Sequence, residues 1–326
     1  MMPLTPINEI HALQILAGTL GRHAGHGFEE RITQTINQIV YPFDVAVGEG
    51  HIRIGDPAIL LLSYISARLG AKQILRATAI STGALATSEE GKSWLSINGA
   101  SISRCKSDLV VTLQLAQDKS TTVGVSTKQC NNKVPTNAQL YFTTARGFAT
   151  LLNNNGISVS PQAVKALRQF CGDVGFQPQD NPSLLAKRKV DPRRFFWEET
   201  DAHGRNEWCR ILGKYQDEIS RLLFQKAYLD DPFVPEFLLH KTKRSASWEA
   251  TQVAIYSIDE LITLSRQHQG FVTKPYSVKK GSYKDPAGVT HLAPRFGIIQ
   301  MQRGGQQQHP EQLQFNLAAG YFYKLE

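Results

Sequence analysis

The chain has 326 residues, of which 41% are apolar and 20% charged, so it is long enough for one large domain or two smaller ones and too apolar to be disordered. Its 36 lysines and arginines against 28 aspartates and glutamates leave a net charge of +8, which favours a polyanionic partner. No apolar run is long enough to span a membrane, and the first residues lack a secretory signal pattern. With four cysteines far apart and no CxxC spacing, we expect a cytoplasmic protein with reduced thiols.

The first half of the chain changes its periodicity from helical to strand-like. Phe28, Ile32 and Ile36 recur at helical spacing, and Pro57 opens a second apolar stretch that predicts one or two helices over 57–80. Alternating patterns then predict three strands, over residues 93–101, 106–115 and 121–128. A polar turn at 117–120 joins the second strand to the third.

The second half is predicted to be helical first and then to consist of loops and short strands. Helical patterns cover 138–152, 161–171, 206–229 and 246–268, and short strands follow from residue 270. We therefore predict an α/β, or mixed α+β, fold with helices flanking a central sheet. Three consecutive parts are expected: a core over 1–172, a linker and helical region over 173–245, and a basic region over 246–326.

A predicted hairpin carries the residues with the clearest chemical pattern. Asp108 precedes the strand LVVTL, and Ser126 and Lys128 lie near the end of the following strand. Alternate residues of a strand face the same side, so Ser126 and Lys128 share a face. If the two strands are neighbours, all three side chains converge at one end of the sheet.

This pattern resembles the PD-(D/E)XK nuclease fold of type II restriction endonucleases. The resemblance implies that Asp108 binds a divalent metal ion, with Mg²⁺ the expected cofactor, and that Lys128 orients or activates the attacking water. Mg²⁺ prefers carboxylate oxygens and water, it makes a bound water easier to deprotonate, and a nearby lysine stabilises developing negative charge.

The chain departs from the family at Ser126, where an acid is usual. No aspartate or glutamate occurs from Lys119 through Gly172, so the second carboxylate has to come from upstream. Glu29 in the sequence GFEERI is the better candidate, because it shares a helix face with Ile32 and Ile36, whereas Glu30 turns outward. The resemblance then implies that Asp108 and Glu29 bind the metal and that Ser126 positions water or phosphate.

A plain structural interpretation stays open beside the nuclease site. Asp108 is also typical of a turn residue before a strand, and Lys128 is typical of a solvent-exposed lysine at a strand end. Glu29 is typical of an acidic residue in the first turn of a helix, where it interacts favourably with the helix dipole.

Several basic segments are candidates for binding nucleic acid. The acid-free stretch 119–172 includes Lys133 and Arg146 and suits a phosphate backbone, although a solvated basic helix face has the same composition. The basic run 187–194 precedes Phe195, Phe196 and Trp197. Together they either bind and stack on DNA, or the aromatic side chains pack into the core. The C-terminal region adds Lys279, Lys280, Arg295, Gln302 and Arg303. These residues are suited to contacting phosphates or to reading guanine and adenine edges, and the alternative is that they are surface residues of a hairpin.

Together these features favour a Mg²⁺-dependent, site-specific endonuclease that hydrolyses phosphodiester bonds of double-stranded DNA in a restriction system. Cleavage of both strands implies two active sites and hence a homodimer. Two alternatives stay open: a non-catalytic DNA-binding protein that retains the nuclease fold, and a small-molecule enzyme whose positive charge is incidental.

Overall fold

The computed structural model describes residues 25–45, 48, 50–82, 96–97, 100–101, 105–116, 119–226, 231–279, 284–304 and 311–319. The chain divides into two compact units that are interleaved in the sequence. Unit 1 comprises Met1–Ala138 and Phe224–Thr263, and unit 2 comprises Gln139–Leu223 and Leu264–Leu325. This division differs from the three consecutive parts expected over 1–172, 173–245 and 246–326, because each unit combines segments that are distant along the chain.

Unit 1 is built on a six-stranded mixed sheet of order β2-β11-β10-β8-β7-β4. Neighbouring strands are antiparallel except for β8 and β10, which run parallel. The strands are β2 (Ile52–Gly55), β4 (Arg76–Ser81), β7 (Leu109–Ala116), β8 (Lys119–Gln129), β10 (Pro235–Lys241) and β11 (Thr251–Ser257). Short pairs are formed by β1 (Phe43–Asp44) with β3 (Gln73–Ile74), and by β5 (Ser96–Ile97) with β6 (Ala100–Ser101).

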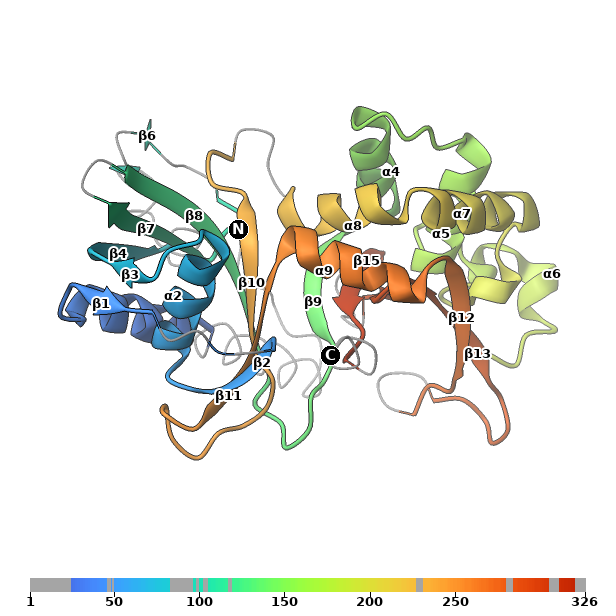
Figure 1. Ribbon diagram of the computed structural model, residues 1–326. Coiled ribbons are helices and arrows are strands. Elements are labelled where there is room, and N and C mark those ends of the chain that lie inside the picture. The colour runs from blue at the N-terminus through green and yellow to red at the C-terminus, as the bar shows by residue number, and fades with distance from the viewer. Residues whose placement is uncertain are drawn as a thin grey trace. The chain divides into compact units, whose positions relative to one another are not determined.

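Two helices cover one face of this sheet. The first is the helix over residues 25–38, and the second is α2 (Pro57–Arg68) (Figure 1). The Asp56 side chain caps α2 by accepting from the backbone N–H of Ala58 at 2.8 Å. Buried apolar side chains of both helices and of the facing strand residues form one core, which includes Ile32, Leu61 and Val125. This burial stabilises the unit and fixes the first helix against β8.

Unit 2 contains a five-stranded sheet of order β12-β13-β14-β15-β9. Its strands are β9 (Ala138–Thr144), β12 (Phe271–Tyr276), β13 (His291–Phe296), β14 (Ile299–Arg303) and β15 (Gln312–Leu317). Its helices are α4 (Ala145–Asn154), α5 (Pro161–Cys171), α6 (Pro182–Leu185) and α7 (Ala202–Lys214), with 3₁₀ turns at Pro178–Asp180, Trp197–Glu199 and Arg266–His268. Two further helices, α8 (Gln216–Gln225) and α9 (Ile258–Ser265), span the sequence positions where the chain changes unit.

Aromatic packing joins the helices and the sheet of unit 2. Phe148 of α4 stacks on Trp208 of α7 with ring centroids 5.5 Å apart, and it also contacts Phe315 of β15 at 4.5 Å. The indole N–H of Trp208 donates to the carbonyl of Ala163 in α5 at 2.7 Å. These three rings are fully or nearly fully buried, so they form the core between α4, α7 and β15.

The mixed α+β class, with helices flanking a central sheet, is confirmed, but three predicted helices were wrong in part. The helix predicted over 57–80 ends at Arg68, and 76–81 is a strand. The first half of the helix predicted over 138–152 is the strand β9, and 251–257 within the predicted 246–268 helix is the strand β11. Pairing to neighbouring strands decided these segments, because short apolar runs fit either period.

No helix in the described part of the chain is both long enough and apolar enough to cross a bilayer.

Candidate functional site

The candidate site lies where β7 begins and β8 ends, within unit 1. Asp108 precedes β7, and its backbone N–H donates to the carbonyl of Val125 in β8 at 2.8 Å. This pairing brings the Asp108 carboxylate beside the next residues of β8. The hydroxyl of Ser126 donates to Asp108 Oδ2 at 3.0 Å, and Lys128 Nζ lies 3.3 Å from the same oxygen. The structure therefore brings Asp108, Ser126 and Lys128 together.

The Lys128 ammonium is held by three acceptors at the end of β8. Besides Asp108, it donates to Ser126 Oγ at 2.9 Å and to the carbonyl of Thr127 at 2.6 Å. Its side chain is 19% exposed, so the charge is partly shielded from water but still accessible. A lysine fixed in this way provides a positive charge that needs little reorganisation when negative charge develops beside it.

Glu29 approaches the same strand end from the helix over residues 25–38. Its side chain is buried, and its Oε1 accepts a hydrogen bond from the hydroxyl of Thr127 at 2.8 Å. Burial, and after it the negative charge of Asp108, raise the pKa of Glu29 to about 7, although the Thr127 hydrogen bond and the Lys128 charge act in the opposite direction. The two carboxylates are therefore close enough to interact electrostatically.

Thr127 is the residue at this site that the sequence patterns did not reveal. Side chains alternate along β8, so Ser126 and Lys128 face one side and Thr127 faces the side covered by the first helix. Its backbone N–H donates to Asp108 Oδ2 at 2.7 Å, while its hydroxyl holds Glu29. No sequence signal marks it, because it is the middle residue of S-x-K and its role depends on a helix distant in the sequence.

The residues present fit a divalent cation. Glu29 Oε2 is buried and has no hydrogen-bond partner, which leaves a carboxylate oxygen available as a ligand. Asp108 supplies a second carboxylate, and hard cations such as Mg²⁺ take oxygen ligands and keep several waters. In the described part of the chain, no three or more His, Cys, Asp or Glu side chains gather as a metal cluster, so a bound ion would rely on this pair and on water.

The positive charge of Lys128 lowers the pKa of two further titratable groups. Burial, and after it the Lys128 charge, lower the pKa of Lys106 to about 8, although the charges of Asp108 and Asp231 oppose the shift. His240 on β10 is the register partner of Lys128, and burial together with that charge lowers its pKa to about 4. The sheet next to Lys128 therefore holds a neutral imidazole at neutral pH. Glu30, by contrast, is exposed and accepts from Gln34 Nε2 at 3.3 Å.

The predicted DNA-contacting residues fall into two groups. Lys133 in unit 1 and Arg146 and Lys279 in unit 2 are exposed, as a phosphate contact requires. Lys280 lies outside the described residues. Contacts between these side chains and DNA stay predictions.

The other three take part in contacts inside unit 2. Arg295 is 8% exposed and donates to the carbonyl of Gly297. Gln302 Oε1 accepts from Asn316 Nδ2 at 2.9 Å, and Arg303 donates to the carbonyl of Phe195 at 3.2 Å. These internal contacts do not favour the reading of base edges by these three side chains, which stays a prediction.

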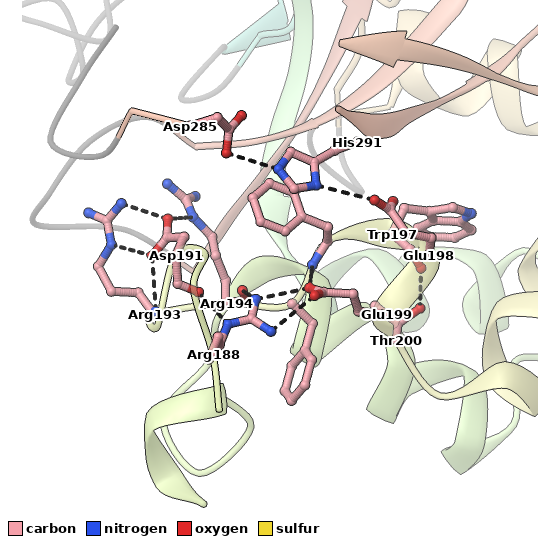
Figure 2. A network of polar contacts seen from close by, with 12 residues as sticks. Arg188, Asp191, Arg193, Arg194, Trp197, Glu198, Glu199, Thr200, Asp285 and His291 are labelled. Atoms are coloured by element: carbon pink, nitrogen blue, oxygen red, sulfur yellow. Dashed lines mark hydrogen bonds and ion pairs between the residues drawn. The ribbon is translucent and has the colours of Figure 1, made fainter. Parts of the chain in front are cut away.

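The basic run over 187–194 and its aromatic residues belong to a polar network within unit 2. Figure 2 shows Arg188 donating to both oxygens of Glu199, at 3.0 and 2.9 Å, and Arg193 donating to both oxygens of Asp191, at 2.8 and 2.7 Å. Phe196 and Trp197 are 0% and 2% exposed. Of the two interpretations left open, this arrangement favours aromatic residues that re-enter the core.

The same network anchors β13. Figure 2 shows His291 between Glu198 and Asp285, which lie 3.2 Å and 3.0 Å from its ring nitrogens. The His291 ring also stacks on Phe196. The pairing of both ring nitrogens with carboxylates ties the segment before α7 to the sheet of unit 2.

Among the solved structures that match the chain in general shape is one of a protein–DNA complex. It is a crystal structure of the restriction endonuclease MspI in complex with its cognate DNA, 12% identical, with 78% of this chain and 76% of that chain covered and a TM-score of 0.43. No protein-family model and no curated protein sequence matches the chain. At this identity and score the likeness concerns the general course of the chain, and the function has to be inferred from the site itself.

Proposed function

We propose that the protein is a metal-dependent endonuclease that hydrolyses phosphodiester bonds of double-stranded DNA. The observation that carries this proposal is the convergence of Asp108, Lys128 and Glu29 at one strand end, with Lys128 Nζ 3.3 Å from Asp108 Oδ2 and a buried Glu29 oxygen left without a partner. Two carboxylates for a cation beside a fixed lysine suit the hydrolysis of a phosphodiester. The net charge of +8 suits a DNA substrate.

Each residue then has a distinct role. Asp108 and Glu29 would hold Mg²⁺, which when bound lowers the pKa of a coordinated water and offsets the charge of the scissile phosphate. Lys128 orients the attacking water and stabilises the charge that develops on the phosphate. Ser126 donates to Asp108 and accepts from Lys128, so it keeps both groups in place.

The finer proposal is a type II restriction enzyme that acts as a homodimer at a specific sequence. Hydrolysis of both strands of a duplex by one kind of site calls for two copies related by two-fold symmetry.

A second candidate function is DNA binding without cleavage. The observation that favours it is the ion pair between Lys128 and Asp108 together with a serine at the position of the usual second acid, because both reduce the negative charge offered to a cation.

The experiment is incubation of plasmid DNA of mixed sequence with the protein and Mg²⁺, with a chelator as the control. We expect discrete fragments that disappear with the chelator, whereas a smear would show non-specific cleavage and intact plasmid that is still bound would support the second candidate.

The matched variants Glu29→Gln and Glu30→Gln assign the second carboxylate. Glu29→Gln removes a buried charge at the site and should reduce cleavage nearly as much as Asp108→Asn, about a hundredfold or more. Glu30→Gln removes an exposed charge one residue away and should have little effect. Full activity of Glu29→Gln would exclude the proposed helix-borne ligand.

A further inference from the structure

Two loops extend directly from the strands that carry the candidate site. Lys128 lies one residue before the end of β8, and its register partner His240 lies one residue before the end of β10. Because β8 and β10 are parallel, both strands end at the same edge of the sheet. Residues 130–134 and 242–250 therefore leave the sheet of unit 1 side by side.

Hydrogen bonds hold these loops together. The N–H of Cys130 donates to the carbonyl of Lys241 at 2.8 Å, and the N–H of Arg244 donates to the carbonyl of Asn132, also at 2.8 Å. Lys241 Nζ donates to Asn131 Oδ1 at 3.1 Å. The loops therefore present one continuous surface.

This surface is basic. It carries the four cations Lys133, Lys241, Lys243 and Arg244, called here the basic ridge, and Lys133 and Arg244 are exposed. Neither 119–137 nor 237–248 contains an aspartate or glutamate. The next acid in the loop, Glu249, is exposed, and hydrogen bonds from its own backbone N–H and from the Ser247 hydroxyl lower its pKa, with a smaller contribution from the Arg31 charge.

We propose that the basic ridge binds the phosphate backbone of the DNA strand that flanks the phosphodiester at Lys128. The proposal rests on the proposed DNA-cleaving function and names the surface that holds the substrate. Cations spaced along two paired loops can meet successive phosphates, and such contacts orient the duplex without reading its sequence. Amide groups of Asn131 and Asn132 in the same loops add hydrogen-bond donors of the kind that contact phosphate and sugar oxygens.

The test compares a ridge variant with a matched variant on the same sheet. The ridge variant is Lys243→Gln/Arg244→Gln. The control is Arg76→Gln, an exposed cation on β4 whose register partner Gln114 lies at the end of β7 away from Asp108. Thermal unfolding of all variants checks that the fold is intact, and the N–H bond of residue 244 survives the substitution.

Binding is measured by fluorescence anisotropy on two duplexes of unrelated sequence, with Ca²⁺ in place of Mg²⁺, over about 50–200 mM salt. The double ridge variant should lose roughly tenfold in affinity per contact at about 0.1 M salt, equally for both duplexes, and the slope of log affinity against log salt should become shallower by about two. The control should match the wild type.

Cleavage gives an independent result. With saturating DNA at low salt, the ridge variant should keep the wild-type kcat, because Lys128 and the carboxylates are unchanged, while its KM rises. If the wild type binds DNA and the ridge variant binds it with the same affinity and the same salt slope, the proposed role of the basic ridge is wrong, while the nuclease proposal stands. A wild type that binds no DNA would overturn the proposed function itself.

Discussion

Thr127 joins the three charged groups of the candidate site through three of its own polar atoms. Its N–H donates to Asp108, its hydroxyl donates to Glu29, and its carbonyl accepts from Lys128. The residue is 6% exposed, so water competes little for these bonds. Only the hydroxyl depends on the side chain, which makes that one contact open to substitution.

Replacement of Thr127 by valine removes the hydroxyl and keeps the shape. Glu29 then loses its hydrogen bond, and a partner that orients a metal ligand typically contributes tenfold to a hundredfold to metal affinity. We expect Thr127→Val to need about tenfold more Mg²⁺ for half-maximal plasmid cleavage, while its DNA affinity without divalent metal stays at the wild-type value.

Thr127→Ser is the control for this prediction, because it keeps the hydroxyl. It should restore most of the wild-type Mg²⁺ requirement. An unchanged Mg²⁺ requirement in Thr127→Val would show that the bond to Glu29 does not position a metal ligand.

At the scale of elements, the approach of α5 and α7 depends on the absence of a side chain at Gly204. A Cβ atom there would lie 2.1 Å from the backbone oxygen of Gln162 and 2.8 Å from Cβ of Ala166, and real Cβ contacts are not that short. Backbone atoms cannot rotate away as side chains do, so the two helices would have to separate. Gly213 lies on the same helix, but a Cβ there would meet nothing closer than 3.8 Å.

This difference predicts opposite effects of the same substitution on one helix. Gly204→Ala should lower the free energy of unfolding by about 1–3 kcal/mol, as over-packing does. Gly213→Ala should raise it by up to about 1 kcal/mol, because alanine favours the helix interior more than glycine. Urea denaturation measures both, and equal stability of the two variants would contradict the close approach of α5 and α7.

The elements also show which local patterns were sufficient. The hairpin of β7 and β8 was predicted, because both strands alternate and a polar turn joins them. The segment TQVAIYS predicts part of a helix, since it is an apolar run that leads directly into the helix α9, but it forms the strand β11. Its antiparallel pairing with both β10 and β2 decided its conformation.

At the scale of the whole molecule, the chain forms two units, each assembled from segments that are distant in the sequence. The described residues place one set of Asp108, Lys128 and Glu29 in unit 1, so each copy of the chain has one candidate site. If the protein cleaves both strands in one binding event, two copies must act together.

Mixing subunits tests this expectation. When wild-type protein is re-associated with an excess of Lys128→Ala protein, most wild-type subunits should be in dimers with one functional site, and these dimers should convert supercoiled plasmid to nicked circles. Wild-type protein alone should produce linear DNA directly. Two results together would contradict the homodimer: the mixture yields the same fraction of linear product as the wild type alone, and light scattering gives the mass of a monomer.

The composition class, the mixed α+β pattern and the hairpin of Asp108, Ser126 and Lys128 could be predicted from the sequence, because they follow from local periodicity and from residues about 20 apart along the chain. The helix face of Glu29 also marked it as the candidate second carboxylate, but its placement beside the hairpin, like that of the loops next to the site, depends on tertiary packing. Glu29 reaches β8 through a helix that packs on the sheet, and the loop of Lys243 and Arg244 lies beside 130–134 through a parallel pairing across more than a hundred residues. Such contacts depend on burial and strand register, which no local pattern encodes.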